Sequence, residues 1–114
     1  TSYTQALHRI WGDITDTRMH ITGGLGAVHG IEGFGPQFLL PNADAFNETC
    51  AAVGNVLFNF RMFLVHKDAK YPDVAEVSLL NNLLAAVNLE SNRFFYVNPL
   101  EADGKYPFNH GTAG

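Results

Sequence analysis

Apolar side chains in the middle of the chain recur at the spacing of an α-helix and occupy more than one side of it. From Val53 to Leu64 they stand at positions 53, 56, 57, 60 and 64, which form one stripe of a helix. Phe58, Met62 and Phe63 lie beside that stripe. A helix that is apolar on several faces is usually packed inside a larger helical assembly. The pattern therefore favours a piece of a helical solenoid or α-barrel over a closed bundle.

Two further helices are expected on either side of this one. Apolar residues recur at helical spacing from Ser2 to about Thr17, which predicts a first helix. The middle helix should end near positions 66–68. A third helix should open at Pro72, a good first-turn residue, and end near Asn88. Leu79 and Leu83 stand beside its main apolar stripe, so it too is apolar on more than one face.

The rest of the chain predicts a loop and one strand. Six of the eleven glycines lie between Gly23 and Gly35, which indicates a glycine-rich loop. Segment 93–97 is aromatic and β-branched and stops at Asn98-Pro99, which is typical of a short strand. The expected fold class is all-α, with about three helices, the glycine-rich loop and one short strand.

Composition limits the size and the partners of the protein. A chain of 114 residues is at most one domain. Its charged residues make up 16%, against roughly 25% in an ordinary soluble domain, so part of its surface should be covered by something else. With its abrupt, polar ends, this predicts an internal segment, 1–114, of an incomplete domain.

Charge and hydropathy exclude several classes of function. A net charge of -4 gives no electrostatic footprint for nucleic acid or an acidic membrane. No apolar run reaches the roughly 18 residues that a membrane span needs, so the chain should be soluble. The single cysteine, Cys50, cannot form an intrachain disulfide.

Glu48 and Cys50 form a candidate metal-binding pair. A carboxylate and a thiol are both Zn²⁺ ligands once deprotonated. In mid-helix, residues two apart point about 200° away from each other, so a shared metal requires an extended or turn segment. If both bind, they should lie where the loop enters the middle helix. The alternative is a buried cysteine preceded by an ordinary first-turn glutamate.

Glu32 is a candidate general acid. It is the one acid in a stretch of apolar residues and glycines from Gly30 to Gly35. Burial in such a setting raises the pKa of a carboxyl group and allows a protonated acid at neutral pH. The alternative is a solvated loop glutamate, because acids are mostly exposed.

Four other polar residues are candidates for binding or for a place on the surface. His20 and His29 flank the glycine-rich loop and are candidates for binding sugar hydroxyls or a metal, or else for a structural role. Asn59 and Arg61 should lie on the polar side of the middle helix.

Seven segments in collinear order resemble the bacterial β-L-arabinofuranosidases of glycoside hydrolase family 127. The resemblance covers nearly all of the chain from Trp11 onward, and the Glu-Thr-Cys and Arg-Phe-Phe-Tyr-Val-Asn-Pro-Leu segments are the most specific. The segments are Ile21 to Gly26, Glu32 to Gly35, Leu40 to Asn42, Glu48 to Gly54, Arg61 to Leu64, Asp68 to Tyr71 and Arg93 to Leu100.

The resemblance implies an (α/α)6-barrel catalytic domain, of which these residues would be a part, and retaining hydrolysis of L-arabinofuranosides. In that family a glutamate of the glycine-rich loop is the general acid/base, and it falls on Glu32. In that family one glutamate and three cysteines hold a Zn²⁺. The glutamate falls on Glu48, and one of the cysteines falls on Cys50. The remaining two ligands are a Cys-Cys pair that would come shortly after Gly114, and one of that pair is the nucleophile.

Two functions therefore remain open at this point. The first is a segment of a zinc-dependent retaining glycosidase, soluble and either cytoplasmic or periplasmic in a bacterium. The second is a non-catalytic helical binding or interaction module in which Cys50 is merely a core residue. Taken alone, the segment should be inactive and should self-associate through the apolar helix faces.

Overall fold

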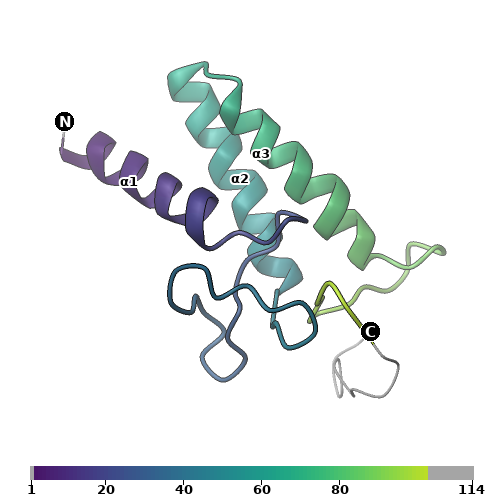
Figure 1. Cartoon of the computed structure of the whole chain (residues 1–114). Helices are drawn as coiled ribbons and strands as arrows, with labels where there is room; N and C mark the ends of the chain where they lie inside the picture. Colours follow the sequence, from purple (N-terminus) through teal and green to yellow (C-terminus); the bar gives the residue numbers. More distant parts are fainter. Residues whose placement is uncertain (1, 103–114) are drawn as a thin grey trace.

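The computed structural model describes residues 2–102, and these form an all-helical arrangement around a long loop (Figure 1). The helices are α1 (Ser2–Thr17), α2 (Thr49–His66) and α3 (Lys70–Ser78). Helix α3 continues into a π-helical stretch, η1 (Leu79–Leu83), and a 3₁₀ turn, η2 (Leu84–Ala86). The all-α prediction and the bounds of the first helix are confirmed, and the middle helix ends where it was expected.

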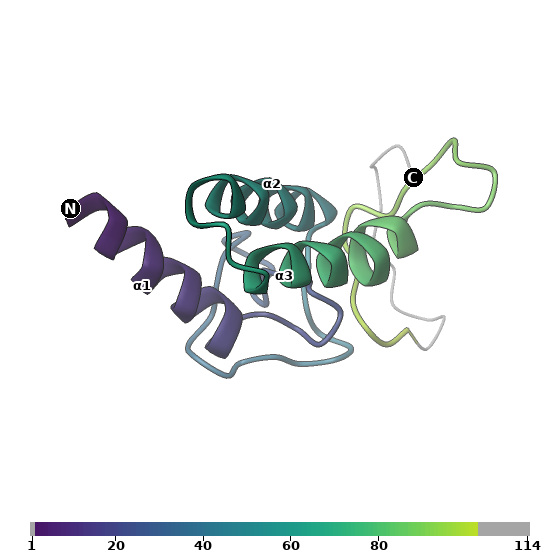
Figure 2. The same ribbon diagram turned by 90° about the horizontal axis from the view of Figure 1, so that it is seen from above.

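Helices α2 and α3 lie side by side in opposite directions, while α1 extends away from them (Figures 1 and 2). A left-handed Lys67, with φ of 55°, ends α2, and its N–H caps the carbonyl of Phe63. Helix α3 begins two residues earlier than predicted. The carboxylate of Asp68 accepts a hydrogen bond from the N–H of Lys70 at 3.1 Å. This bond satisfies one of the backbone N–H groups of the first turn, so the helix can begin before Pro72.

The strand predicted at 93–97 is not formed. Within residues 2–102 the only ladder-type pairings are isolated antiparallel bridges, two of which involve this segment: Val87 with Phe94, and Glu48 with Val97. The segment changes partners along its length, because the N–H of Phe95 donates to Ala86 while the carbonyl of Tyr96 accepts from Thr49. An aromatic, β-branched composition fits such an extended connector as well as it fits a strand.

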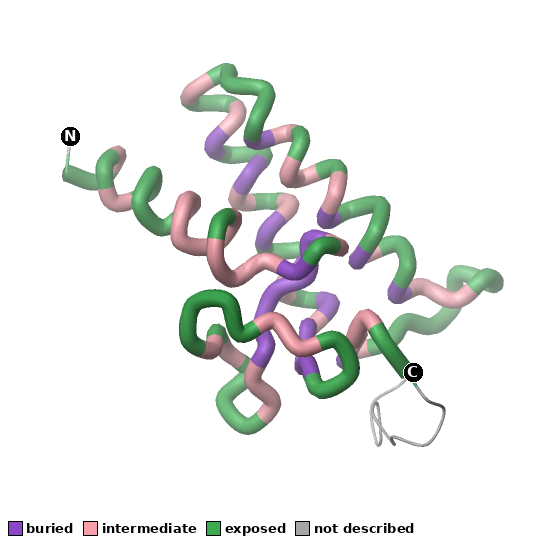
Figure 3. The backbone as a smooth tube through the Cα atoms, in the orientation of Figure 1, coloured by how far each residue is buried: buried purple, intermediate pink, exposed green. Residues whose placement is uncertain are grey.

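Helix α2 is buried along one side (Figure 3), and the buried residues are Thr49, Ala52, Asn55, Asn59 and Met62, three of which are polar. Asn59 is fully buried, so its predicted place on the exposed polar side is wrong, whereas Arg61 is exposed as predicted. The reason is a hydrogen bond of 2.7 Å from the Trp11 indole N–H on α1 to Oδ1 of Asn59. The apolar stripe instead points outward, with Leu57 57% and Phe60 53% exposed.

Buried polar side chains connect all three helices to the glycine-rich loop. The Asn59 amide donates to Asn55 at 2.9 Å, and the Asn55 amide donates to the Ser78 hydroxyl at 2.8 Å. The Ser78 hydroxyl donates in turn to the carbonyl of Gly23 at 3.1 Å. Gly23 has φ of 81°, and a Cβ there would lie 2.5 Å from Cα of Ser78, so only glycine allows this approach. These hydrogen bonds and this close approach hold the start of the glycine-rich loop against α3.

Candidate active site

The residues around Glu48 are held between two other segments of the chain. On one side the N–H of Asn47 donates to the carbonyl of Gly26 at 2.6 Å. On the other side Glu48 pairs with Val97, and the N–H of Thr49 donates to the carbonyl of Tyr96 at 3.0 Å. The glycine-rich loop and segment 95–98 therefore meet at the point where α2 begins.

Glu48 and Cys50 lie at the junction of loop and helix, as the sequence predicts. Glu48 is the N-cap residue of α2, with φ of −60° and ψ of 131°, and Cys50 is the second residue of the helix. The extended backbone at Glu48 allows the two side chains to turn to the same side, and the Cys50 thiol hydrogen-bonds to the Glu48 carboxylate. Cys50 is exposed, so the alternative of a core cysteine is wrong for the described residues.

Glu48 also binds the phenol of Tyr96. The Tyr96 hydroxyl is hydrogen-bonded to the Glu48 carboxylate, and this bond, with some burial and the negative charges of Glu48 and Glu32, raises the pKa of Tyr96 to about 12. Glu48 thus affects the pKa of both the Cys50 thiol and the Tyr96 phenol.

The pKa of the Cys50 thiol is raised above its usual range. The hydrogen bond to Glu48 is the largest cause, followed by burial and by the negative charges of Glu48 and Glu32. The helix backbone at Cys50 acts in the opposite direction and is outweighed. Cys50 and Tyr96 both respond to the charge of Glu32, so the predicted acid lies in the same electrostatic environment as the predicted metal ligands.

Glu32 stands on a tight turn of the glycine-rich loop. Its φ is 48°, its N–H donates to the carbonyl of His29 at 3.2 Å, and a Val28–Gly33 bridge closes the turn. The Arg18 guanidinium at the end of α1 donates to the carbonyl of Gly35 and holds the far side of the loop. Glu32 is exposed, so the buried setting considered for a general acid is not found within residues 2–102.

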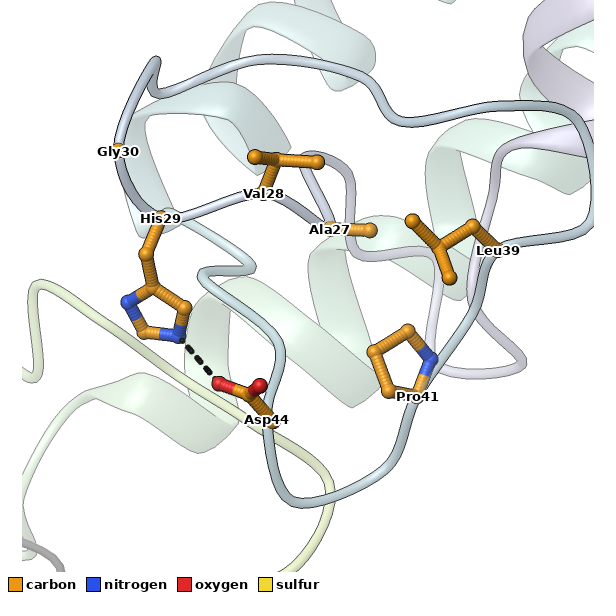
Figure 4. A pocket seen from close by; sticks show the side chains of 7 residues that line it. All are labelled: Ala27, Val28, His29, Gly30, Leu39, Pro41 and Asp44. Carbon is orange, nitrogen blue, oxygen red and sulfur yellow. Dashed lines mark ion pairs between the residues drawn. The ribbon is translucent and has the colours of Figure 1, made fainter.

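The two histidines that flank the loop lie in different environments. His20 is only 2% exposed, and burial lowers the pKa of its imidazole. His29 borders an open hollow of about 500 Å³ (Figure 4), where its Nε2 lies 3.5 Å from Oδ1 of Asp44. Neither joins Glu48 and Cys50, since the described residues hold no group of three or more His, Cys, Asp or Glu side chains placed to bind a metal.

The chemistry of the donor pair fits half of a zinc site. Glu48 and Cys50 carry the carboxylate oxygen and sulfur that zinc accepts, and they are already in contact. Because Cys50 is exposed, further ligands can approach from outside. Zinc binding would displace the proton of the Cys50 thiol, because the ligand form of cysteine is the thiolate.

Sequence reasoning missed two residues of this site, Tyr96 and Thr49. Both lie in segments that carry the family resemblance, but their residue types alone indicate no role in the site. The contacts that define their roles join positions 46 to 48 residues apart in the chain, and no spacing rule reports such pairings.

The described residues thus form an all-helical arrangement with a carboxylate–thiol pair at a helix start and an acid on a neighbouring loop. The family Beta-L-arabinofuranosidase, GH127 catalytic domain, matches residues 1–111. The chain belongs to this family. The catalytic domain of the family is an (α/α)6 barrel, as expected.

Individual relatives agree with this assignment. The chain is 37% identical over 93 residues to the non-reducing end β-L-arabinofuranosidase of Bifidobacterium longum subsp. longum. The aligned residues make up 82% of this chain and 14% of that relative. The solved GH127 β-arabinofuranosidase BT3674 is 51% identical, with a TM-score of 0.89 over 92% of this chain and 17% of that one.

The GH127 β-L-arabinofuranosidase Ara127N-Se from Geobacillus stearothermophilus T6 is similar in the same way. It is 41% identical, with a TM-score of 0.84 over 90% of this chain and 16% of that one. The chain therefore spans less than a fifth of the length of each of these relatives.

Proposed function

We propose that these residues supply the general acid/base and half of the zinc site of a retaining β-L-arabinofuranosidase. The observation that carries the proposal is that the glycine-rich loop and segment 95–98 both meet the chain at Glu48 and Thr49, where α2 begins. The effects of Glu32 and Glu48 on the pKa values of Cys50 and Tyr96 agree with this arrangement. Membership of the family supports L-arabinofuranosides as the substrate class. No helix within residues 2–102 is long and apolar enough to cross a membrane.

Glu32 is proposed to protonate the leaving glycosidic oxygen and later to activate water. Its place on an exposed turn leaves the carboxyl free to reach a sugar, and its charge already acts on Cys50. A retaining mechanism needs one group for both proton transfers and a second group as nucleophile.

Glu48 and Cys50 are proposed to hold zinc together with a downstream Cys-Cys pair, one member of which is the nucleophile. Zinc supplies the positive charge that keeps cysteine ligands as thiolates at neutral pH. Tyr96 keeps its hydrogen bond to Glu48 when the Cys50 proton is lost, and so holds the carboxylate in orientation.

The division of roles is tested by Glu32→Gln and Glu48→Gln in the full-length protein. Glu32→Gln should lower the hydrolysis of an aryl β-L-arabinofuranoside by about 10² to 10⁴-fold without changing zinc content, because it removes only proton transfer. Glu48→Gln should lower zinc content as well as activity. If both variants keep full zinc and equal activity, the roles are wrongly assigned.

The outward apolar face of α2, together with that of η1 and η2, supports a further proposal for the 114-residue chain on its own. Large apolar side chains of these three elements are exposed, so the chain alone should self-associate. They are Val53, Leu57, Phe60, Leu64, Val65, Leu79, Leu80 and Leu84.

A further inference from the structure

The middle residue of the Glu48-Thr49-Cys50 segment has two contacts that the proposed chemistry does not use. Thr49 is 6% exposed and is the first residue of α2. Its hydroxyl donates to the carbonyl of Phe95 at 2.6 Å, and its N–H donates to the carbonyl of Tyr96 at 3.0 Å. One residue therefore binds two consecutive carbonyls of a segment 46 residues away.

These bonds close a ring of interactions around Glu48. From Thr49 the ring runs through two hydrogen bonds to the main chain of Phe95 and Tyr96. It continues from this segment to Glu48 through the antiparallel bridge between Val97 and Glu48, and returns along the chain to Thr49. Glu48 also raises the pKa of the Tyr96 phenol, which supports a place for that phenol beside the Glu48 carboxylate. The direction of the Glu48 carboxylate thus depends on where segment 95–97 is held.

We propose that Thr49 is a positioning residue for the metal site. Its hydroxyl sets the register of segment 95–97 so that Tyr96 orients the carboxylate of Glu48 toward the cation. The proposal rests on the proposed zinc-binding role of Glu48. Groups that orient a metal ligand typically change metal affinity by 10 to 100-fold when they are removed. Thr49 acts through Tyr96 and Glu48, and it does not itself touch the metal or the substrate.

The test compares zinc affinity, by competition with a chromophoric chelator, among variants of the full-length protein. Thr49→Val keeps the shape of the side chain and removes the hydroxyl, and we expect zinc binding to weaken by about 10 to 100-fold. Thr49→Ser keeps the hydroxyl and should restore most of the affinity. Thr15→Val is the matched control, because the Thr15 hydroxyl donates to the carbonyl of Trp11 at 2.8 Å on α1 and contacts neither segment.

Two further variants keep the test decisive. If valine is not accommodated at the buried position, Thr49→Ala removes the same hydroxyl without adding a methyl group. Tyr96→Phe removes the phenol hydroxyl beside the Glu48 carboxylate, so the double variant Thr49→Val with Tyr96→Phe should bind zinc little worse than Tyr96→Phe alone.

Each outcome separates the inference from the proposed function. Zinc affinity in Thr49→Val equal to that of Thr15→Val overturns the role of Thr49 and leaves the zinc site standing. Equal losses in Thr49→Val and Thr49→Ser also overturn it, because the hydroxyl would then not matter. A wild-type protein that binds no zinc overturns the proposed function and this inference together.

Discussion

Gly24 should not tolerate a side chain, because two buried amides occupy the space that a Cβ would need. A Cβ on Gly24 would lie 2.8 Å from Cγ of Asn47, and nearer still to Oδ1 of Asn47 and Nδ2 of Asn82. Asn47 is 0% and Asn82 is 1% exposed, so neither can move into solvent. Overpacking of this kind costs about 1–3 kcal/mol, and the reduced freedom of the unfolded chain returns about 0.4–1 kcal/mol. Gly24→Ala should therefore destabilise the protein by about 1.3 kcal/mol, within a range of about 0–2.6 kcal/mol.

The matched control is Gly30→Ala, in the same loop. A Cβ on Gly30 would meet no heavy atom within 4 Å, so this variant should be neutral or more stable by up to about 1 kcal/mol. Urea denaturation followed by circular dichroism measures the free energy of unfolding of both variants. Since Asn47 directly precedes Glu48, Gly24→Ala should also weaken zinc binding, whereas Gly30→Ala should not. Equal stability and equal zinc affinity in the two variants would refute the packing argument.

Three other outcomes follow from the same geometry. Burial lowers the pKa of His20, so the neutral side chain favours the folded state above the unfolded pKa of about 6.5. This contribution to stability is lost as pH falls below that value, at about 1.4 kcal/mol per unit of pKa difference between the folded and unfolded states. The urea midpoint should therefore depend less on pH in His20→Gln than in the wild type between about pH 7.5 and 5. The 114-residue chain alone should not hydrolyse an aryl arabinofuranoside, because it lacks the proposed nucleophile, and turnover that Glu32→Gln abolishes would contradict the two-cysteine mechanism. Light scattering after size exclusion should show that this chain self-associates and carries little zinc; a dilution-resistant monomer with one equivalent of zinc would contradict both expectations.

Periodicity was sufficient to find the helices but not the faces by which they pack. The stripe through Leu57 and Phe60 was correctly assigned to a helix, yet the residues that pack against α1 and α3 are Asn55 and Asn59. A sequence pattern reports that one face is apolar, and it does not report which elements lie beside that face. The strand at 93–97 failed for a related reason, because its partners change along its length.

The site was predictable in part because it depends on backbone position. The two-residue spacing of Glu48 and Cys50 required a loop–helix junction, and the pair lies at one. Tyr96 could not be assigned in the same way, because its hydrogen bond to Glu48 depends on segment 95–97 returning to the start of α2. Chemistry within one segment can be read from residue types, whereas contacts between distant segments depend on tertiary structure.

X-ray absorption at the zinc edge of the purified full-length protein would show whether Glu48 and Cys50 are zinc ligands. We expect one equivalent of zinc with three sulfur ligands at about 2.3 Å and one oxygen, and a loss of one sulfur in Cys50→Ser. A coordination shell without sulfur, or a shell that Cys50→Ser leaves unchanged, would contradict this expectation.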